Sequence, residues 1–288
     1  SLPPQKLGAA PSGGIPIHAS LRLSSPPPNK TDGDMYGRSV WIKQCGVRFQ
    51  MYLHEKQDTV SDHITKYGVV YCDLDLIQHF EEGRKRGVKL TFVDIGSNVG
   101  SCAVLAAAMG HEAWAFEPLP LNFHLIERTI EANDRFGGRL HLTKCGASDK
   151  SGSFDIFTLP FNYGHSTVKK QAHLDKQYVK NSCCMQKFDE VVPPSIEVDL
   201  MKLDTEGHES RALQGATSLF SNASRMPVFV NFELWGPVAR AQGLDPYAAR
   251  NFLLQRSYKV ILQQNEGALH DEHALLCGAI GRKYSVSC

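Results

Sequence analysis

The chain of 288 residues lacks a long hydrophobic run, an excess of either charge and the cysteine spacings of a structural zinc site. Its longest apolar run, residues 102–109, falls far short of the ~20 residues that a membrane-spanning helix needs. Its 31 Lys and Arg residues nearly cancel its 30 Asp and Glu residues, so it carries no broad basic surface. We therefore expect no membrane span and no nucleic-acid partner.

The eight cysteines include no CxxC pair and no Cys/His ligand spacing, which argues against a zinc site. Cys102, Cys145 and Cys277 lie in apolar segments, so we predict that each is a free thiol in the core. The adjacent Cys183 and Cys184 lie in a polar segment and are candidates for oxidation. No disulfide pairing can be assigned to them from the sequence.

The composition divides the chain into an arm and a globular part. Residues 1–38 are rich in Pro, Gly and Ser and predict an extended arm or linker, which is a candidate docking segment for a protein partner. Residues 39–288 are predicted to form one domain. Within it, residues 39–89 supply a lead-in hairpin and helix, and residues 90–288 form the core.

The sequence is compatible with two cellular locations. The chain begins at Ser1, so we expect that an N-terminal segment has been removed. The arm and the glycosylation sequons at Asn29 and Asn222 favour a lumenal or organellar location. The expected core thiols keep a cytoplasmic location open.

From residue 90 onward, short apolar segments alternate with helical patterns. Seven strands are predicted, at residues 90–95, 112–116, 140–144, 198–203, 227–232, 258–262 and 274–280. Helices are predicted between them, at residues 99–109, 121–136, 209–220 and 246–255. Residues 149–195 are polar and are expected to be mostly loop. This alternation predicts an α/β fold, a Rossmann-like seven-stranded and mostly parallel sheet with helices on both faces.

Ligands of such sheets bind beyond the carboxyl ends of the strands, so the residues there are the candidates for function. The first strand runs into a turn with the pattern Asp-x-Gly-x-x-x-Gly, from Asp94 to Gly100, whose glycines permit a tight bend and close approach of a ligand. The turn lacks the G-x-G-x-x-G spacing of a dinucleotide site. Glu117 ends the second strand roughly 20 residues after Asp94, an offset at which a carboxylate accepts ribose hydroxyls.

Acidic side chains follow the fourth and fifth strands. Asp204, Glu206 and His208 surround the start of a helix, and Glu233 ends the next strand. Because these strand ends share one edge of the sheet, we expect the three carboxylates to converge. Such a group suits general acid/base chemistry or a divalent cation with oxygen ligands, and we assign no metal to it.

Three segments in order resemble the FkbM-type family of class I S-adenosylmethionine-dependent methyltransferases. The segments are VDIGSNVG at residues 93–100, AFEPLPLN at residues 115–122 and KLDTEGHE at residues 202–209. A family-like lead-in at residues 64–73 and the strand that ends in Glu233 extend the resemblance, which covers residues 40–283. Ser97 and Thr205 depart from the family's more frequent Ala and Val.

The resemblance implies the class I methyltransferase fold, S-adenosylmethionine as the cofactor, and a set of cofactor-binding residues. Those residues are Asp94, Gly96, Ser97, Asn98, Gly100, Glu117, Ala147, Ser148 and Asp204. The glycine-rich turn would frame the methionine and ribose, Glu117 would accept the ribose hydroxyls, and Ala147 and Ser148 would flank the adenine.

The resemblance also implies O-methylation of a hydroxyl on a glycan or small-molecule acceptor. Asp204, Glu206, His208 and Glu233 are the candidate catalytic residues, and His165 is a further candidate base. A catalytically silent protein of the same fold, acting as a docking subunit of a larger assembly, is the alternative. The turn spacing and the EGxE segment argue against a third class, the NAD-dependent dehydrogenases.

Overall fold

The computed structural model describes residues 37–55, 58–136, 138–159, 162–168, 177–263 and 275–280. Residues 1–36, which make up nearly all of the expected arm, lie outside this range, so the arm and its docking role stay predictions. No helix among the described residues has the length and apolar character required to cross a bilayer.

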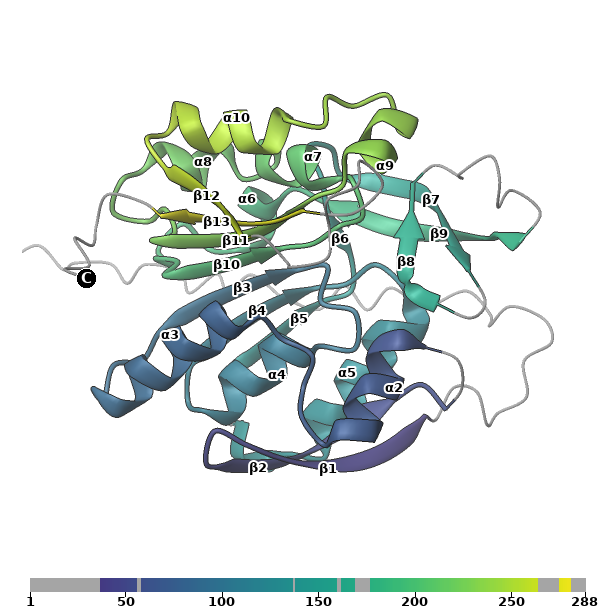
Figure 1. Ribbon diagram of the computed structural model, residues 1–288, viewed down its shortest axis with the longest axis vertical. Helices are drawn as coiled ribbons and strands as arrows, with labels where there is room; N and C mark the ends of the chain where they lie inside the picture. Colours follow the sequence, from purple (N-terminus) through teal and green to yellow (C-terminus); the bar gives the residue numbers. More distant parts are fainter. Residues whose placement is uncertain are drawn as a thin grey trace, which may run out of the picture. The chain divides into compact units, whose positions relative to one another are not determined.

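A seven-stranded sheet forms the centre of the domain, with the strand order β12-β13-β11-β10-β3-β4-β5 (Figure 1). Five neighbouring strands, β11 to β5 in this order, run parallel, and β13 is antiparallel to both of its neighbours. The strands are β3 (Thr91–Ile95), β4 (Glu112–Phe116), β5 (Leu140–Thr143), β10 (Leu200–Leu203), β11 (Phe229–Leu234), β12 (Lys259–Gln263) and β13 (Leu275–Ile280). The prediction of a seven-stranded, mostly parallel sheet is confirmed.

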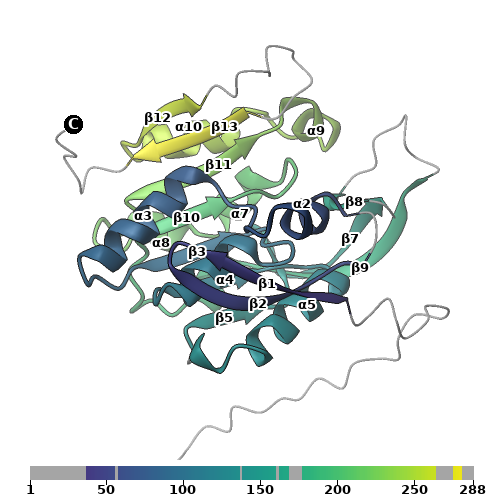
Figure 2. The ribbon, with the colours of Figure 1, turned by 60° about the horizontal axis from the view of Figure 1, so that its bottom comes forward.

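One face of the sheet is covered by helix α4 and by a hairpin packed beyond it (Figure 2). Helix α4 (Ser101–Ala108) is apolar all round and is buried along nearly its whole length, as a helix between two layers must be. The expected hairpin consists of β1 (Arg38–Gln44) and β2 (Val47–Leu53), paired antiparallel. The same layer contains α2 (Thr59–Tyr67), α3 (Leu74–Lys85), α5 (Pro120–Glu131) and the short helix η1 (Asp134–Phe136).

Amphipathic helices cover the opposite face and bury a second core that includes Phe188, Leu219, Phe232 and Leu253 (Figure 1). The helices of the C-terminal half are α6 (Phe188–Val191), α7 (Glu209–Gln214), α8 (Thr217–Ser221), α9 (Gly236–Ala241) and α10 (Ala248–Gln255). Sequence patterns indicated one continuous helix over residues 209–220, but Gly215 interrupts it between α7 and α8. A Cβ at Gly215 would lie 2.0 Å from the backbone oxygen of Ser148, which explains the glycine.

The expectation of a mostly loop-like segment at residues 149–195 is wrong. This stretch supplies most of a four-stranded sheet in the order β6-β9-β7-β8. Its strands are β6 (Gly146–Ala147), β7 (Gly152–Leu159), β8 (Asn162–Thr167) and β9 (Val179–Gln186). The pattern misled because β7 and β9 bury only a few side chains, so polar residues dominate both strands.

Two of the three expected core thiols are instead disulfide-bonded. Cys102 in α4 pairs with Cys72, and Cys145 after β5 pairs with Cys184 in β9. The adjacent Cys183 is a buried free thiol. Apolar surroundings did not distinguish a buried thiol from a buried disulfide, since both are found in cores. The side chain of Cys277 lies outside the described residues.

The Cys72–Cys102 bond closes a loop of 30 residues between the lead-in segment and α4. Replacing both cysteines, Cys72→Ala with Cys102→Ala, should lower the free energy of unfolding by about 2–4 kcal/mol, because the unfolded chain regains loop freedom. Urea unfolding without reductant measures this loss, and Cys45→Ala, at a free cysteine, is the control. Equal stability of the double variant and the wild type would contradict the pairing.

Candidate active site

The turn after β3 lies directly against the end of β10. Gly96 has a φ of 81°, and a Cβ there would lie 1.8 Å from the backbone oxygen of Asp204. The backbone N–H of Asp204 donates to the carbonyl of Ile95 at 3.0 Å, which holds the two segments together. Because the obstacle is backbone, which cannot swing aside, only glycine fits at this junction.

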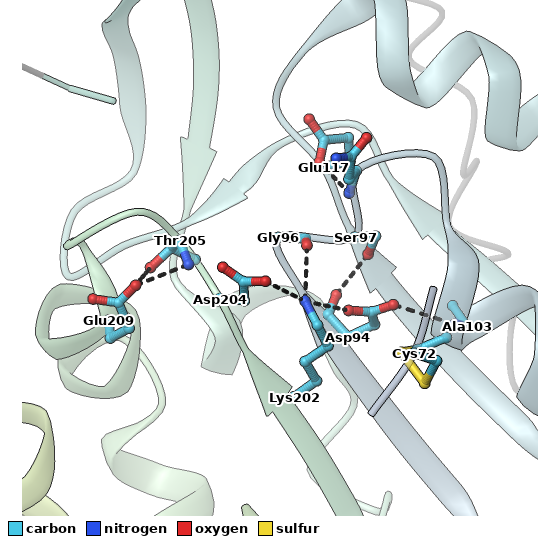
Figure 3. A network of polar contacts seen from close by, with 12 residues as sticks. Cys72, Asp94, Gly96, Ser97, Ala103, Glu117, Lys202, Asp204, Thr205 and Glu209 are labelled. Atoms are coloured by element: carbon cyan, nitrogen blue, oxygen red, sulfur yellow. Dashed lines mark hydrogen bonds and ion pairs between the residues drawn. A yellow bond between two sulfur atoms is a disulfide. The ribbon is translucent and has the colours of Figure 1, made fainter. Parts of the chain in front are cut away.

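A largely buried lysine, Lys202, ties the same two strand ends together (Figure 3). The Nζ of Lys202 lies 2.9 Å from Oδ2 of Asp204, donates to the Gly96 carbonyl at 3.4 Å and lies 3.9 Å from Oδ1 of Asp94. Burial alone would lower the pKa of Lys202, but the Asp204 and Asp94 carboxylates raise it above its usual value. Lys202 therefore remains charged beneath the site.

Asp94 supports the turn from below. Its carboxylate is 1% exposed, and Oδ2 accepts a hydrogen bond from the backbone N–H of Ala103 in the first turn of α4 at 3.2 Å. Burial raises the pKa of Asp94 to about 6, although Lys202 and the Ala103 N–H act in the opposite direction. Asp94 thus positions the start of α4 and anchors Lys202.

Glu117, at the end of β4, faces the turn (Figure 3). Its Oε2 accepts from the Asn98 backbone N–H at 2.8 Å, and its Oε1 accepts from the Leu119 N–H at 3.0 Å and from Nδ2 of Asn122 at 3.2 Å. Burial raises the pKa of Glu117 to about 7, and these hydrogen bonds limit the rise. On its other side, Oδ1 of Asn122 lies 2.8 Å from Nε2 of His54, which connects Glu117 to the end of β2.

Glu209 shapes the loop between β10 and α7. Its Oε1 accepts from the Thr205 N–H at 2.9 Å, from Oγ1 of Thr205 at 3.1 Å and from the Gly207 N–H at 3.1 Å. Glu206 and Gly207 both have positive φ, 54° and 85°. Gln242, just after α9, donates from Nε2 to the carbonyl of Glu206 at 2.7 Å. The loop is thus held in an unusual backbone conformation by contacts from both sides.

These strand ends surround a cavity of about 270 Å³. Asp204, Glu206 and Glu233 line it, and each offers a carboxylate oxygen within 4.8 Å of the other two. Burial, reinforced by repulsion among the three carboxylates, raises the pKa values of Glu206 and Glu233 well above the usual value. The expected convergence is confirmed, and the spacing is also that of a divalent-cation site.

His208 lines the same cavity as a neutral imidazole. Burial lowers its pKa to about 4, and its Nε2 lies 3.0 Å from Oγ of Ser148. Ser148 is fully buried behind His208 and does not line the cavity. The structure therefore places Ser148 against His208, whereas Ala147 lines the cavity.

The sequence-predicted residues divide into those that line the cavity and those that support its wall. All four candidate catalytic residues line it, as do Gly96, Asn98, Glu117 and Ala147. The supporting residues are buried and do not line the cavity: Asp94, Ser97, Gly100 and Ser148. The roles assigned to all of them stay predictions. The side chain of His165, in β8, lies outside the described residues.

Several lining residues were not predicted from the sequence, among them residues of α2, Tyr71 and residues of β7, β8 and β9. Thr59 and Val60 belong to α2, whose Asp58 N-cap and Gly68 C-cap are recognisable helix signals. Tyr71 also lines the cavity, although it is 58% exposed; its partial burial, followed by repulsion from Asp73, raises its pKa. No local pattern distinguishes this tyrosine from a surface residue.

The parallel sheet, the glycine turn and the carboxylate at the second strand end define a Rossmann-like domain of the methyltransferase-fold class. The family model described as the methyltransferase FkbM domain matches residues 94–260, more than half of the chain. The chain therefore belongs to the FkbM methyltransferase domain family.

Curated relatives agree with this assignment. The chain is 30% identical over 155 residues to the hexuronic acid methyltransferase AglP of Haloferax volcanii, a match that covers 53% of this chain and 56% of AglP. It is 24% identical over 153 residues to the methyltransferase sdnD of Sordaria araneosa, covering 43% of this chain and 59% of sdnD. The chain thus spans little more than half the length of these relatives.

Among solved structures, the methyltransferase FkbM of Methylobacillus flagellatus is 17% identical to the chain, with a TM-score of 0.45. The match covers 66% of this chain and 43% of that one.

Gly96→Ala tests the junction between β3 and β10. Gly87→Ala is its matched control, because Gly87 also has a positive φ, 67°, but a Cβ there meets no atom within 4 Å. The control should lose about 1–2 kcal/mol of unfolding free energy from backbone strain alone. Gly96→Ala should lose clearly more in chemical denaturation. An equal loss of unfolding free energy in the two variants would contradict the close approach of Gly96 to the Asp204 carbonyl.

The pKa of Glu209 predicts a pH-dependent stability. Burial raises this pKa to about 7 in the folded chain from a usual value of 4.5, so the folded state holds the proton more tightly. Its contribution to stability is complete below pH ~4.5 and falls as pH rises toward ~7. Denaturation of the wild type and Glu209→Gln across this range should show the wild type losing more stability with rising pH than the variant does.

The exposed Glu82→Gln controls for the change in net charge in that comparison. Parallel pH profiles for the wild type and Glu209→Gln would contradict the buried position of the Glu209 carboxyl.

Proposed function

We propose that the chain is an S-adenosylmethionine-dependent O-methyltransferase acting on a hydroxyl of a sugar or small molecule. The observation that carries the proposal is the convergence of three separate family segments on one cavity. These segments contribute Gly96 and Asn98, Glu117, and Asp204 with Glu206. The methyltransferase names of the curated relatives support the same activity class.

The residues around the turn fit a nucleoside cofactor. Glu117 lines the cavity with an acceptor carboxylate suited to ribose hydroxyls. Oδ1 of Asn98 is buried and, among the described residues, has no hydrogen-bond partner. It can therefore accept a hydrogen bond from a bound ligand. Gly96 and Gly146 leave the cavity wall without side chains. Bound there, S-adenosylmethionine would supply an electrophilic methyl group.

The carboxylates of this chain would handle the proton that a hydroxyl loses on methylation. The raised pKa values of Glu206 and Glu233, caused by burial and mutual repulsion, make these carboxyls stronger bases than solvent-exposed ones. The neutral imidazole of His208 is a further acceptor in the same cavity. The turn and the acidic loop, fixed by Gly96 and Lys202, would hold the reacting groups in place and limit their motion.

We also propose that the chain matures in an oxidising compartment, such as the lumen of the secretory pathway. The disulfides Cys72–Cys102 and Cys145–Cys184 support this location, because structural disulfides persist mainly where thiols are oxidised.

Isothermal calorimetry with S-adenosylmethionine and S-adenosylhomocysteine tests the cofactor assignment. Glu117→Gln should bind both at least about tenfold more weakly, because a charged acceptor is lost from the ribose position. The exposed Glu82→Gln on α3 should bind as the wild type does. Unchanged affinity of Glu117→Gln would contradict the site, and no binding by the folded wild type would favour the catalytically silent alternative.

A further inference from the structure

A row of side chains leads outward from the cavity along α2. Thr59 and Val60, in the first turn of this helix, line the cavity. His63 and Tyr67 follow about one and two turns later on the same face as Val60, because residues three or four positions apart are neighbours on a helix. This face therefore begins at the cavity and reaches the exposed Tyr67 about 10 Å further along the helix axis.

Tyr71 connects the face of α2 to the cavity a second time. Its ring centroid lies 5.1 Å from that of His63 in an edge-to-face arrangement, and the His63 and Tyr67 centroids are 4.7 Å apart. Tyr71 itself lines the cavity, and partial burial, followed by repulsion from nearby carboxylates, raises its pKa. Its phenol therefore keeps its proton at neutral pH and can donate a hydrogen bond. His63, Tyr67 and Tyr71 together form what we call the aromatic strip.

The aromatic strip is anchored to the domain by its own chain. Tyr71 lies in the segment between α2 and α3, and the next residue, Cys72, is joined by a disulfide to Cys102 of α4. Just before it, the backbone N–H of Val70 donates to Oε1 of Gln44 at 2.8 Å. A binding surface that is fixed in advance loses little conformational entropy when a ligand binds.

The size of the cavity places most of an acceptor outside it. Its volume of about 270 Å³ lies at the lower end of the range for pockets that hold one small molecule, so the proposed cofactor would fill most of it. The remaining space admits only the reacting end of an acceptor. The rest of the acceptor then lies at the mouth of the cavity, where the aromatic strip begins.

Exposed aromatic rings at this position suit a sugar. The face of an aromatic ring is the negative side of its quadrupole, so it attracts the polarised C–H groups on the apolar face of a pyranose. The hydroxyls at the edge of the pyranose stay hydrated or bond to polar groups such as the Tyr71 phenol. A sugar chain can therefore lie along the strip without losing the hydration of all its hydroxyls.

Resting on the methyltransferase function proposed above, we propose that the acceptor is an oligosaccharide and that His63, Tyr67 and Tyr71 bind the sugar units next to the one that is methylated. The methylated unit lies at the cavity, and its neighbours stack on the exposed rings. Lys66 lies over the Tyr67 ring, with Nζ 4.9 Å from the ring centroid. This contact is exposed and weak, so a sugar ring can displace the ammonium group. The strip thus selects acceptors by their length.

A length series of acceptors tests this inference. Transfer of tritiated methyl from S-adenosylmethionine is measured with the full chain on hexoses, xylose and hexuronic acids, on their linear dimers to tetramers, and on catechol as a non-sugar acceptor. We expect kcat/KM for a tetramer to exceed that for its monosaccharide at least about tenfold, because each stacked ring adds binding energy. Equal values across the series overturn the inference, as does transfer confined to catechol.

Tyr67→Ala removes the outermost ring of the strip. The ratio of kcat/KM for the tetramer over the monosaccharide should fall at least about threefold, mainly through a higher KM, whereas Tyr67→Phe, which keeps the ring, should retain the ratio. Tyr247→Ala is the matched control, because Tyr247 is 57% exposed, close to the 56% of Tyr67, and is not among the residues that line the cavity. This control should keep the wild-type ratio. An unchanged ratio in Tyr67→Ala overturns the role of the strip.

Calorimetry with S-adenosylhomocysteine separates this inference from the proposed function. The titration uses the full wild-type chain, with its folding checked by circular dichroism. Binding without transfer to any of the sugars overturns the oligosaccharide acceptor and leaves the cofactor site intact. No binding overturns the methyltransferase function itself.

Discussion

The close approach of Gly96 to the Asp204 carbonyl is the constraint on which the site depends. It brings the glycine turn after β3 against the acidic loop after β10, at a distance that a single Cβ would prevent. Lys202 then lies below and joins Asp94 to Asp204 with one largely buried charge. The glycine turn and Asp204 are thereby held together at one junction.

Around this junction, burial determines the pKa values of the carboxyl groups. Carboxylates that are exposed in most proteins are here enclosed, and the pKa values of Glu117 and Glu209 rise to about 7. Each of these two carboxylates is held by three hydrogen bonds, so they shape the walls of the site. Glu206 and Glu233 line the cavity itself, where burial and repulsion between neighbouring carboxylates raise their pKa values well above the usual value.

Features of the fold and the site that depend on short stretches of sequence were predicted correctly. The apolar helix α4, the parallel strands and the strand-end residues Glu117 and Glu233 follow from short-range patterns. The disulfides could not be predicted, because their partners lie 30 and 39 residues apart and pair only once the chain is folded. The sheet of β6 to β9 was missed because its polar strands lack a clear alternation, and the support roles of Asp94 and Ser148 depend on which way each side chain points.

A crystal structure of the chain with S-adenosylhomocysteine is the most direct test of the central claim, that the strand-end junction is a cofactor site. We expect the ribose hydroxyls to donate to the Glu117 carboxylate, and the sulfur to face the cavity lined by Asp204, Glu206 and Glu233. A nucleoside bound elsewhere on the domain, or one whose ribose does not contact Glu117, would contradict it.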